Sequence, residues 1–291
     1  WVFIKVYTDE GVTGVGEGPL EYKENSLCVA IEDLKRYLVG KSPLDIEAHY
    51  HNMYRDAYWR GGAVLMSAIS AVEMALWDIN AKSLNVPVYR LLGGKINERV
   101  KIYVNGWFAG AKEPHEFAQK AKETVDKGIK AIRDAVGNDI DLLIEGHGRY
   151  DVPTGIKIAK ELEQFKPKFF EEPVPQDNLD ALAAVREKSP VAISAGERLY
   201  TRRSFKELFE KRAADYIQPD ISHAGGIMEL RKIAAMAEAY YIPFAPHNPS
   251  GPIANAATLQ LAACTPNFEI LEIMISDVEW RANITDECLE Y

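Results

Sequence analysis

The sequence predicts an α/β protein, a (β/α)-barrel preceded by an N-terminal α+β capping domain. From Val100 onward, short β-like runs alternate with helical stretches, as is typical of a parallel barrel. Residues 1–99 lack this alternation and combine two short strands with three helical patterns. Acidic and histidine side chains recur at the ends of successive β-like runs. Together these observations favour a barrel with its site at one end.

The predicted capping domain covers residues 1–99. Val2–Tyr7 is rich in β-forming residues, and the glycines that follow indicate a turn and a second strand. Leu27–Leu38 and Ile46–Tyr58 show helical spacing of apolar residues, and Val64–Ile79 shows it most strongly. The last pattern is apolar over a wide arc, so we expect this helix to be buried between two layers. Because the chain opens in mid-strand without a Met, we also expect further residues before Trp1.

The barrel is predicted over residues 100–275, and residues 276–291 are expected to return to the cap. The β-like runs are Val100–Asn105, Gly128–Ala131, Asp141–Glu145, Phe169–Glu172, Val191–Ala195, Tyr216–Gln218, Ile242–Ala245 and Phe268–Ile273. Helical stretches lie between most of them, such as Gly155–Gln164, Leu179–Glu187, Phe205–Lys211 and Met228–Tyr240. An open doubly wound sheet is the rival fold, but the Gly-rich phosphate turn usual after its first strand is missing here.

One junction does not fit the barrel pattern. The run Gly128–Ala131 is followed by the next β-like run only about ten residues later, whereas a crossover between parallel strands needs at least about 10–12 residues including its helix. We therefore infer that a loop and most of a helix are absent between about Ala131 and Ile132. An unseen disordered segment is favoured over a natural deletion.

Charge and composition exclude several classes of protein. The net charge is −9 and no run of five basic residues occurs, which argues against binding to nucleic acid. No apolar stretch is interpreted as long enough to span a bilayer, and the first residues do not resemble a signal peptide. The three cysteines Cys28, Cys264 and Cys288 are scattered and fit neither a disulfide framework nor a zinc site. We expect a cytoplasmic protein without a membrane partner.

Six ionisable residues fall at the ends of successive β-like runs, at intervals of 26, 26, 23, 27 and 25 residues. They are Glu145, Glu171, Glu197, Asp220, His247 and Glu272. Any one of them could merely cap the next helix or face water. Six in register with a βα period instead predict that they converge at the end of the barrel where active sites form. The acids would repel one another unless a cation or shifted pKa values intervene, and three carboxylates on adjacent strands suit Mg²⁺.

Several motifs resemble the enolase superfamily, in particular its mandelate racemase subgroup. They are Phe170-Glu171-Glu172-Pro173, Ala195-Gly196-Glu197-Arg198, Gln218-Pro219-Asp220 with Gly225-Gly226, and Phe244-Ala245-Pro246-His247-Asn248. The stretches Ile144–Arg149 and Tyr103–Trp107 are similar to the sugar-acid dehydratases of that subgroup, especially those acting on gluconate and galactonate. The similarity covers nearly the whole chain, including the cap, and implies an enolase-like, modified TIM barrel.

The resemblance implies roles for individual residues. Glu145, Glu171 and Glu197 become ligands of one Mg²⁺, with Mn²⁺ as a possible substitute. His247 and Asp220 become the paired base, His147 a general acid, and Glu272 a hydrogen-bonding partner of the developing oxyanion. The chain departs from the subgroup at two points: its first ligand is Glu rather than the usual Asp, and the Lys motif expected after the second strand is not visible.

The chemistry explains these residue types. Removing the proton next to a carboxylate creates a doubly charged enediolate, which a Lewis acid stabilises in a water-poor site. A histidine oriented by a carboxylate can take that proton near neutral pH. Loss of the β-hydroxyl needs a second proton, and His147 lies two residues beyond Glu145, on the same face if the strand stays extended. His147 therefore favours dehydration over racemisation.

Further side chains are candidates for binding the substrate. Arg149 and Arg198 could bind a carboxylate or hydroxyls, or neutralise the acids. His223 follows the sixth strand, Trp107 follows the first, and Trp59 belongs to a cap segment that could close over the barrel mouth. Glu172 is expected to point away from the site in a structural role.

The prediction from sequence is thus a Mg²⁺-dependent dehydratase that converts six-carbon aldonic acids, such as gluconate or galactonate, to 2-keto-3-deoxy acids. One alternative is a racemase, epimerase or cycloisomerase on the same scaffold. Another is a non-catalytic metal-binding pseudo-enzyme, which would follow if the strand-two segment is truly deleted. By analogy with the family we also expect a homo-oligomer.

Overall fold

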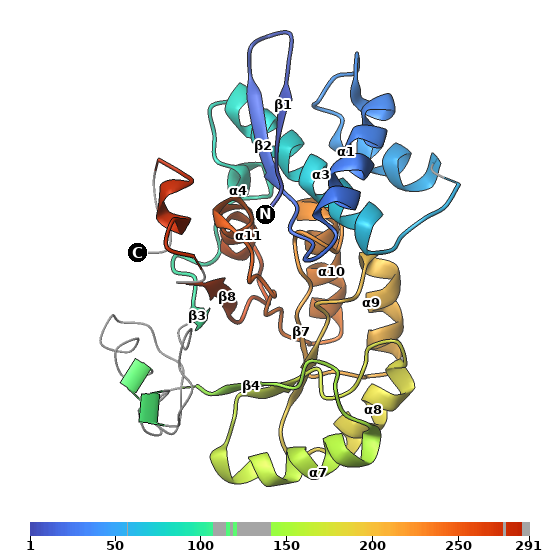
Figure 1. The fold of residues 1–291 in the computed structure, drawn as a ribbon, viewed down its shortest axis with the longest axis vertical. Coiled ribbons are helices and arrows are strands. Elements are labelled where there is room, and N and C mark those ends of the chain that lie inside the picture. Colours follow the sequence, from blue (N-terminus) through green and yellow to red (C-terminus); the bar gives the residue numbers. More distant parts are fainter. Residues whose placement is uncertain (57, 107–114, 117–118, 121–140, 276–277, 287–291) are drawn as a thin grey trace.

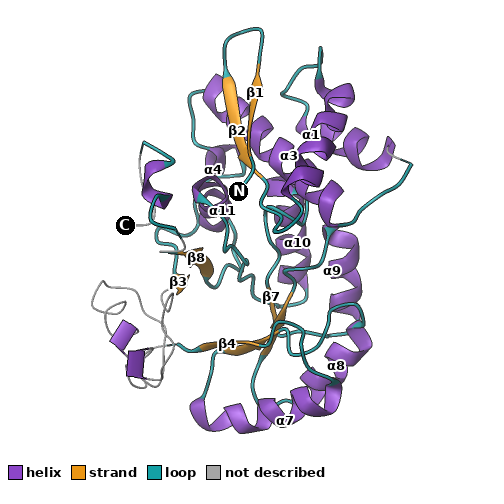
Figure 2. Ribbon diagram, in the orientation of Figure 1, coloured by secondary structure: helices purple, strands orange, loops and turns teal. Residues whose placement is uncertain are grey.

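The computed structural model describes residues 1–56, 58–106, 115–116, 119–120, 141–275 and 278–286 (Figure 1). The cap begins with an antiparallel hairpin of β1 (Phe3–Tyr7) and β2 (Thr13–Glu17). Its helices are α1 (Glu24–Leu38), α2 (Ile46–His51), the π-helix η1 (Asn52–Asp56), α3 (Ala63–Ser83) and α4 (Val88–Leu91). Figure 2 shows the hairpin and these helices gathered at one end of the molecule.

The hairpin packs directly on helix α3, and glycines make this close approach possible. A Cβ at Gly14 would lie 2.1 Å from the carbonyl oxygen of Ala75, and one at Gly16 would lie 2.0 Å from that of Ala71. No side chain larger than hydrogen fits at either position. The glycines that indicated a turn in the sequence therefore also set the distance between strand and helix.

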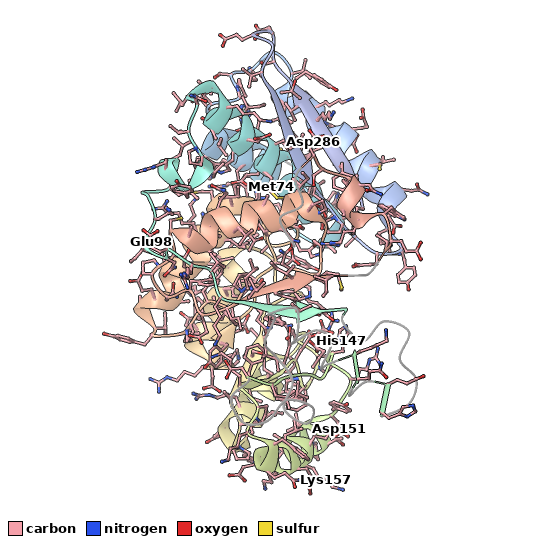
Figure 3. The ribbon with its side chains drawn as sticks, turned by 90° about the vertical axis from the view of Figure 1, so that its left-hand side faces the viewer. Met74, Glu98, His147, Asp151, Lys157 and Asp286 are labelled. Carbon is pink, nitrogen blue, oxygen red and sulfur yellow. The ribbon has the colours of Figure 1, made fainter. Side chains whose placement is uncertain are left out.

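Helix α3 is the central element of the cap. It packs against β2, α1 and the barrel helix α10 (Gly226–Ala239), which explains its apolar residues on nearly every face. Met74 lies at the boundary between the cap and the barrel helices (Figure 3). By length and composition alone α3 could cross a membrane, so the interpretation that no stretch is long enough was wrong. However, 72% of its most apolar window is buried inside the protein, as expected of a core helix.

The barrel follows the predicted alternation. Its described strands are β3 (Ile102–Asn105), β4 (Leu143–Glu145), β5 (Phe169–Glu171), β6 (Ile193–Ala195), β7 (Tyr216–Ile217) and β8 (Leu271–Met274). Its helical elements are α7 (Val152–Leu162), η2 (Glu163–Phe165), α8 (Leu179–Lys188), α9 (Thr201–Glu210), α10 and α11 (Pro252–Ala263). The short helix η3 (Arg281–Asn283) lies in the C-terminal segment after the barrel. The predicted strand at Gly128–Ala131 and the junction at residues 131–132 lie outside the described residues, so both remain predictions.

The described barrel strands form two parallel groups. Strands β4, β5, β6 and β7 pair in that order, and β3 pairs with β8. Phe244 joins the two groups through single bridges to Ile217 and Phe268. The expected strand Ile242–Ala245 is thus reduced to one bridging residue. Mixed α/β layers with parallel strands confirm the barrel-plus-cap fold class.

Local capping residues start two barrel helices where the sequence changes from loop to helix. The Asp151 side chain accepts a hydrogen bond from Thr154 N at 2.8 Å at the start of α7. The Asn178 side chain accepts bonds from the backbone N–H groups of Asp180 and Ala181 at the start of α8. Both residues satisfy donors that the first turn of a helix leaves free.

Two other barrel helices are capped by acids of the capping domain. Glu73 of α3 accepts hydrogen bonds from Ile227 N at 2.7 Å and Met228 N at 2.9 Å, at the start of α10. Glu17 of β2 accepts bonds from Gly251 N, Ile253 N and Ala254 N, at the start of α11. Both carboxylates are completely buried. They hold the cap on the barrel because the free N–H groups and the positive end of each helix dipole face them.

Burial raises the pKa of Glu73 from 4.5 to about 7, against the hydrogen bonds from Met228 and Ile227, which lower it. Because the pKa of Glu73 is higher in the folded than in the unfolded state, the folded protein binds a proton at Glu73 more tightly. This proton contributes to the free energy of unfolding at low pH, and the contribution is lost as the pH rises. We therefore expect the unfolding free energy of the wild type, relative to a Glu73→Gln variant, to fall by about 3 kcal/mol between pH 4.5 and 7 and then level off. Urea unfolding at several pH values measures this. If the unfolding free energy of the wild type relative to Glu73→Gln rose over this pH range, the pKa of Glu73 would not be raised. Glu32→Gln, at an exposed position of α1, is the control.

Candidate active site

Three glutamates converge at the carboxyl ends of neighbouring strands. Glu145 ends β4, Glu171 ends β5, and Glu197 lies two residues beyond β6. One carboxylate oxygen from each lies within 4.8 Å of the others. The register of β4 and β5 places Glu145 directly beside Glu171. The parallel strands thus bring together acids separated by 26 residues in sequence, as the spacing predicted.

This acidic triad is electrostatically unfavourable by itself. Burial, followed by the charge of Glu197, raises the pKa of Glu145 to about 8. Burial and the charge of Glu145 hold the pKa of Glu171 well above 4.5. Burial would also raise the pKa of Glu197, but His247, together with Arg198 and Glu172, lowers that pKa to about 2. Glu145 and Glu171 therefore hold protons more tightly than ordinary carboxylates do. A positive charge nearby would favour their ionised forms and displace these protons.

His247 lies between two acids. Its Nδ1 is 2.8 Å from Asp220 Oδ2, and its Nε2 is 3.0 Å from Glu197 Oε2. Asp220 is completely buried and also accepts a bond from Ser222 N at 2.6 Å, so its position is fixed. Burial alone would lower the pKa of His247, but Glu272, Asp220 and Glu197 raise it well above 6.5. The structure thus pairs His247 with Asp220 as predicted.

Glu272 of β8 completes the ring of acids. Its Oε1 accepts a hydrogen bond from Asn105 Nδ2 at 2.8 Å, and its Oε2 accepts one from Asn248 N at 3.0 Å. The Glu272 Oε2 atom also lies 3.8 Å from His247 Nε2. Neither asparagine was singled out from the sequence, although Asn105 ends β3 and Asn248 directly follows the predicted base His247. A polar residue at or shortly after a predicted β-like run was the signal that could have identified both asparagines.

His147 reaches the site by a different route from the one expected. Strand β4 ends at Glu145, and His147 adopts a left-handed backbone with φ of 55° in the turn that follows (Figure 3). Its backbone N–H donates to Glu145, and its Nδ1 lies 3.3 Å from Glu145 Oε1. The argument from strand alternation was wrong, because the strand does not continue to residue 147. The side chain nevertheless borders the cavity described next.

A cavity of about 830 Å³ joins these groups. The acidic triad, His147, His247 and Glu272 line it, together with Tyr103, Asn105 and Arg198. Leu20 and Glu21 of the cap line it as well, so the cap loop does reach the barrel mouth. Its volume is far larger than a single ion requires and is within the range of small-molecule sites.

The comparisons with known proteins agree with this geometry. The family model described as mandelate racemase/muconate lactonizing enzyme, N-terminal domain, matches residues 1–93, and that described as enolase C-terminal domain-like matches residues 97–291. The chain belongs to the mandelate racemase/muconate lactonizing enzyme family of the enolase superfamily. The resemblance inferred from the motifs is confirmed.

Relatives within the superfamily cover most of the chain. D-galactonate dehydratase of Xanthomonas campestris pv. campestris (strain B100) is 40% identical over 298 residues, covering 94% of this chain and 78% of that protein. D-galactonate dehydratase of Variovorax paradoxus (strain S110) is 38% identical over 299 residues, with the same coverage. The crystal structure of a mandelate racemase/muconate lactonizing enzyme-like protein from Rubrobacter xylanophilus DSM 9941 matches with a TM-score of 0.90 and 34% identity, covering 97% of this chain and 84% of that one.

In this enolase-superfamily chain, Arg198 neutralises acids. It forms ion pairs with the completely buried Glu172 and, at 2.8 Å, with Glu197. Glu172 also accepts a bond from Gln176 at 2.6 Å. Its side chain interacts with that of Glu197, so the expectation that Glu172 points away from the site was wrong. Arg198 still borders the cavity. Of the two functions considered for it, neutralisation is the one that the contacts favour.

His223 links the barrel site to the cap. It lines the cavity, and its Nδ1 lies 2.8 Å from Ser67 Oγ of α3. Two other predicted binding residues are not brought to the cavity: Arg149 is exposed beside the turn, and Trp59 is 83% exposed on the cap surface. Trp107 lies outside the described residues.

The triad fits a hard divalent cation. All three side chains supply carboxylate oxygens, which such cations prefer. The Oε1 atom of Glu171 is buried and has no hydrogen-bond partner within the described residues. Burial, then repulsion between neighbouring carboxylates, raises the pKa values of Glu145 and Glu171, which a bound positive charge would lower. An oxygen-ligated cation supplies what this set of donors lacks.

Proposed function

We propose that this protein is a divalent-cation-dependent dehydratase of aldonic acids of the gluconate or galactonate type. The convergence of an acidic triad, the His247–Asp220 pair and His147 on one cavity carries the proposal. The names of the relatives, D-galactonate dehydratases at about 40% identity, support the same reaction class.

Glu145, Glu171 and Glu197 would hold the cation, with Mg²⁺ the ion best suited to three carboxylates. When bound, the cation acts as a Lewis acid that stabilises negative charge developing on the substrate carboxylate. Glu197 would then direct its charge to the cation rather than to His247. This leaves His247 Nε2 free to accept the proton from the carbon next to the carboxylate, while Asp220 stabilises the resulting imidazolium.

The β-hydroxyl leaves as the electrons of the broken C–H bond form a carbon–carbon double bond. His147 would give this hydroxyl a proton, so that water departs. The enol that remains becomes a 2-keto-3-deoxy acid by moving a proton from oxygen to carbon. Glu272, held by Asn105 and Asn248, is placed beside His247 to receive a hydrogen bond from the substrate in its enol form.

The cap side of the cavity would receive the far end of the substrate. Leu20 and Glu21 of the cap loop lie there, and His223 is held by Ser67 of α3. A histidine whose Nδ1 is engaged can offer Nε2 to a sugar hydroxyl. The cap would in this way contribute to choosing among aldonic acids.

We expect Mg²⁺ to raise the melting temperature, because a ligand that binds only the folded state stabilises it by about 2.7 kcal/mol at 100 times its Kd. Glu171→Gln should remove this effect, since it takes one negative oxygen from the triad. Glu21→Gln, an exposed acid on the same cavity, should keep it. Thermal unfolding with and without Mg²⁺ is the measurement, and an equal shift in the Glu171→Gln protein would disprove the assignment.

With Mg²⁺ present, we expect the protein to convert gluconate or galactonate to an α-keto acid. His247→Asn should reduce turnover by about 10²–10⁴-fold, the usual contribution of a general base, while circular dichroism shows that the fold is kept. A panel of aldonic acids with a colorimetric α-keto acid assay tests both statements. Exchange of the α-proton for deuterium without loss of water would instead indicate a racemase, and neither exchange nor turnover would indicate a pseudo-enzyme.

His223→Ala should raise KM for a six-carbon acid by about tenfold, the value of one lost hydrogen bond, and change kcat little. Ser70→Ala is the matched control, because Ser70 on the same helix accepts a bond from Gly225 N in the same loop without contacting His223. If both variants raised KM equally, the effect would come from the loop and not from His223.

A further inference from the structure

Several polar side chains lie in the interior of the barrel beneath the acidic triad, beside the apolar residues that pack on Tyr103. Glu171 pairs in register with Ser194, and Tyr103 pairs in register with Glu272. Residues paired in a parallel sheet project to the same face, so Ser194 and Tyr103 point into the barrel with the acids. Gln218 lies two residues beyond Tyr216, the partner of Ser194, and therefore faces inward as well.

These side chains are almost completely removed from solvent. The exposed fractions are 7% for Tyr103, 6% for Glu171, and zero for Ser194 and Gln218. Within the described residues, the phenol oxygen of Tyr103, Oε1 of Glu171, Oγ of Ser194 and both amide atoms of Gln218 have no partner that meets hydrogen-bond geometry, although the Gln218 side chain lies close enough to the Tyr103 phenol to interact with it. A buried polar group left in this state costs about 1–3 kcal/mol. Five such atoms in one place therefore indicate a ligand that satisfies them.

The unpartnered atoms are chemically complementary. Tyr103 supplies a donor, Glu171 an acceptor, and Ser194 and Gln218 supply both. Burial, then the charges of Glu272 and Glu171, raise the pKa of Tyr103 well above 10, so its phenol keeps the proton it would donate. Ala245, which packs with Tyr103, and Ser194 are both small residues. Water is the small molecule that such a mixed, enclosed set of donors and acceptors binds.

We propose that bound water occupies the barrel interior below the triad and that, through it, Tyr103 and Gln218 position the carboxylate of Glu171. A carboxylate that gives one oxygen to a cation keeps the other for the protein, and this second contact fixes its orientation. Partners of this kind change metal affinity by about 10–100-fold in other sites. Tyr103 is thus a positioning residue, and this part of the inference rests on the proposed cation site.

Tyr103→Phe removes only the hydroxyl and tests the positioning. We expect it to weaken Mg²⁺ binding about tenfold, measured by calorimetry without substrate. Tyr216→Phe is the matched control. It removes a phenol from the same interior, but one that lies near Lys168 and Glu269 and away from the triad, so it should leave Mg²⁺ affinity unchanged.

A high-resolution crystal structure of the wild type tests the water directly. Electron density for water within hydrogen-bond distance of Ser194 or Gln218, as well as of Tyr103 and Glu171, is the expected result. A dry interior at Ser194 and Gln218 overturns the proposal whether or not the protein is an enzyme. Unchanged Mg²⁺ affinity in Tyr103→Phe overturns the positioning role. Weaker substrate binding with unchanged Mg²⁺ affinity would also overturn it, since the phenol would then act on the substrate. Wild-type Mg²⁺ binding without dehydration of any aldonic acid would refute the proposed function alone.

Discussion

Repulsion among the acids at one end of the barrel is the constraint on which the site depends. Glu145, Glu171 and Glu197 meet because parallel strands end at a common edge, and burial there removes the water that would screen them. The fold offsets part of this cost with His247 and Arg198, which contact Glu197 from two sides. The triad still carries more negative charge than His247 and Arg198 balance. This excess lies at the place proposed for the cation and the substrate carboxylate.

The cap contributes to the site through its joints with the barrel. Glu73 and Glu17 cap the helices that follow the loops carrying Asp220 and His247, and Ser67 and Ser70 contact the first of these loops. The residues that hold the two domains together therefore also determine where the proposed base lies. A cap that only covered the barrel mouth would not need buried acids at these positions.

Much of the site followed from spacing in the sequence. A strand and its helix take about 25 residues here, so acids repeated at that period had to reach the same edge once the barrel closed. His147 shows the limit of this reasoning: alternation along a strand holds only while the strand lasts, and β4 ends two residues earlier. Arg149 and Trp59 were chosen by residue type near the site, and residue type does not determine the direction of a side chain.

The sequence by itself determined the barrel, the cap and the set of acids at the strand ends, because periodicity and strand-end position are local properties of the chain. Only the tertiary structure decided that Arg198 neutralises Glu172 and Glu197, that Asn105 and Asn248 hold Glu272, and that a serine of the cap contacts His223. These contacts join residues far apart in sequence. Their formation depends on how strands and helices pack in space, which no local pattern records.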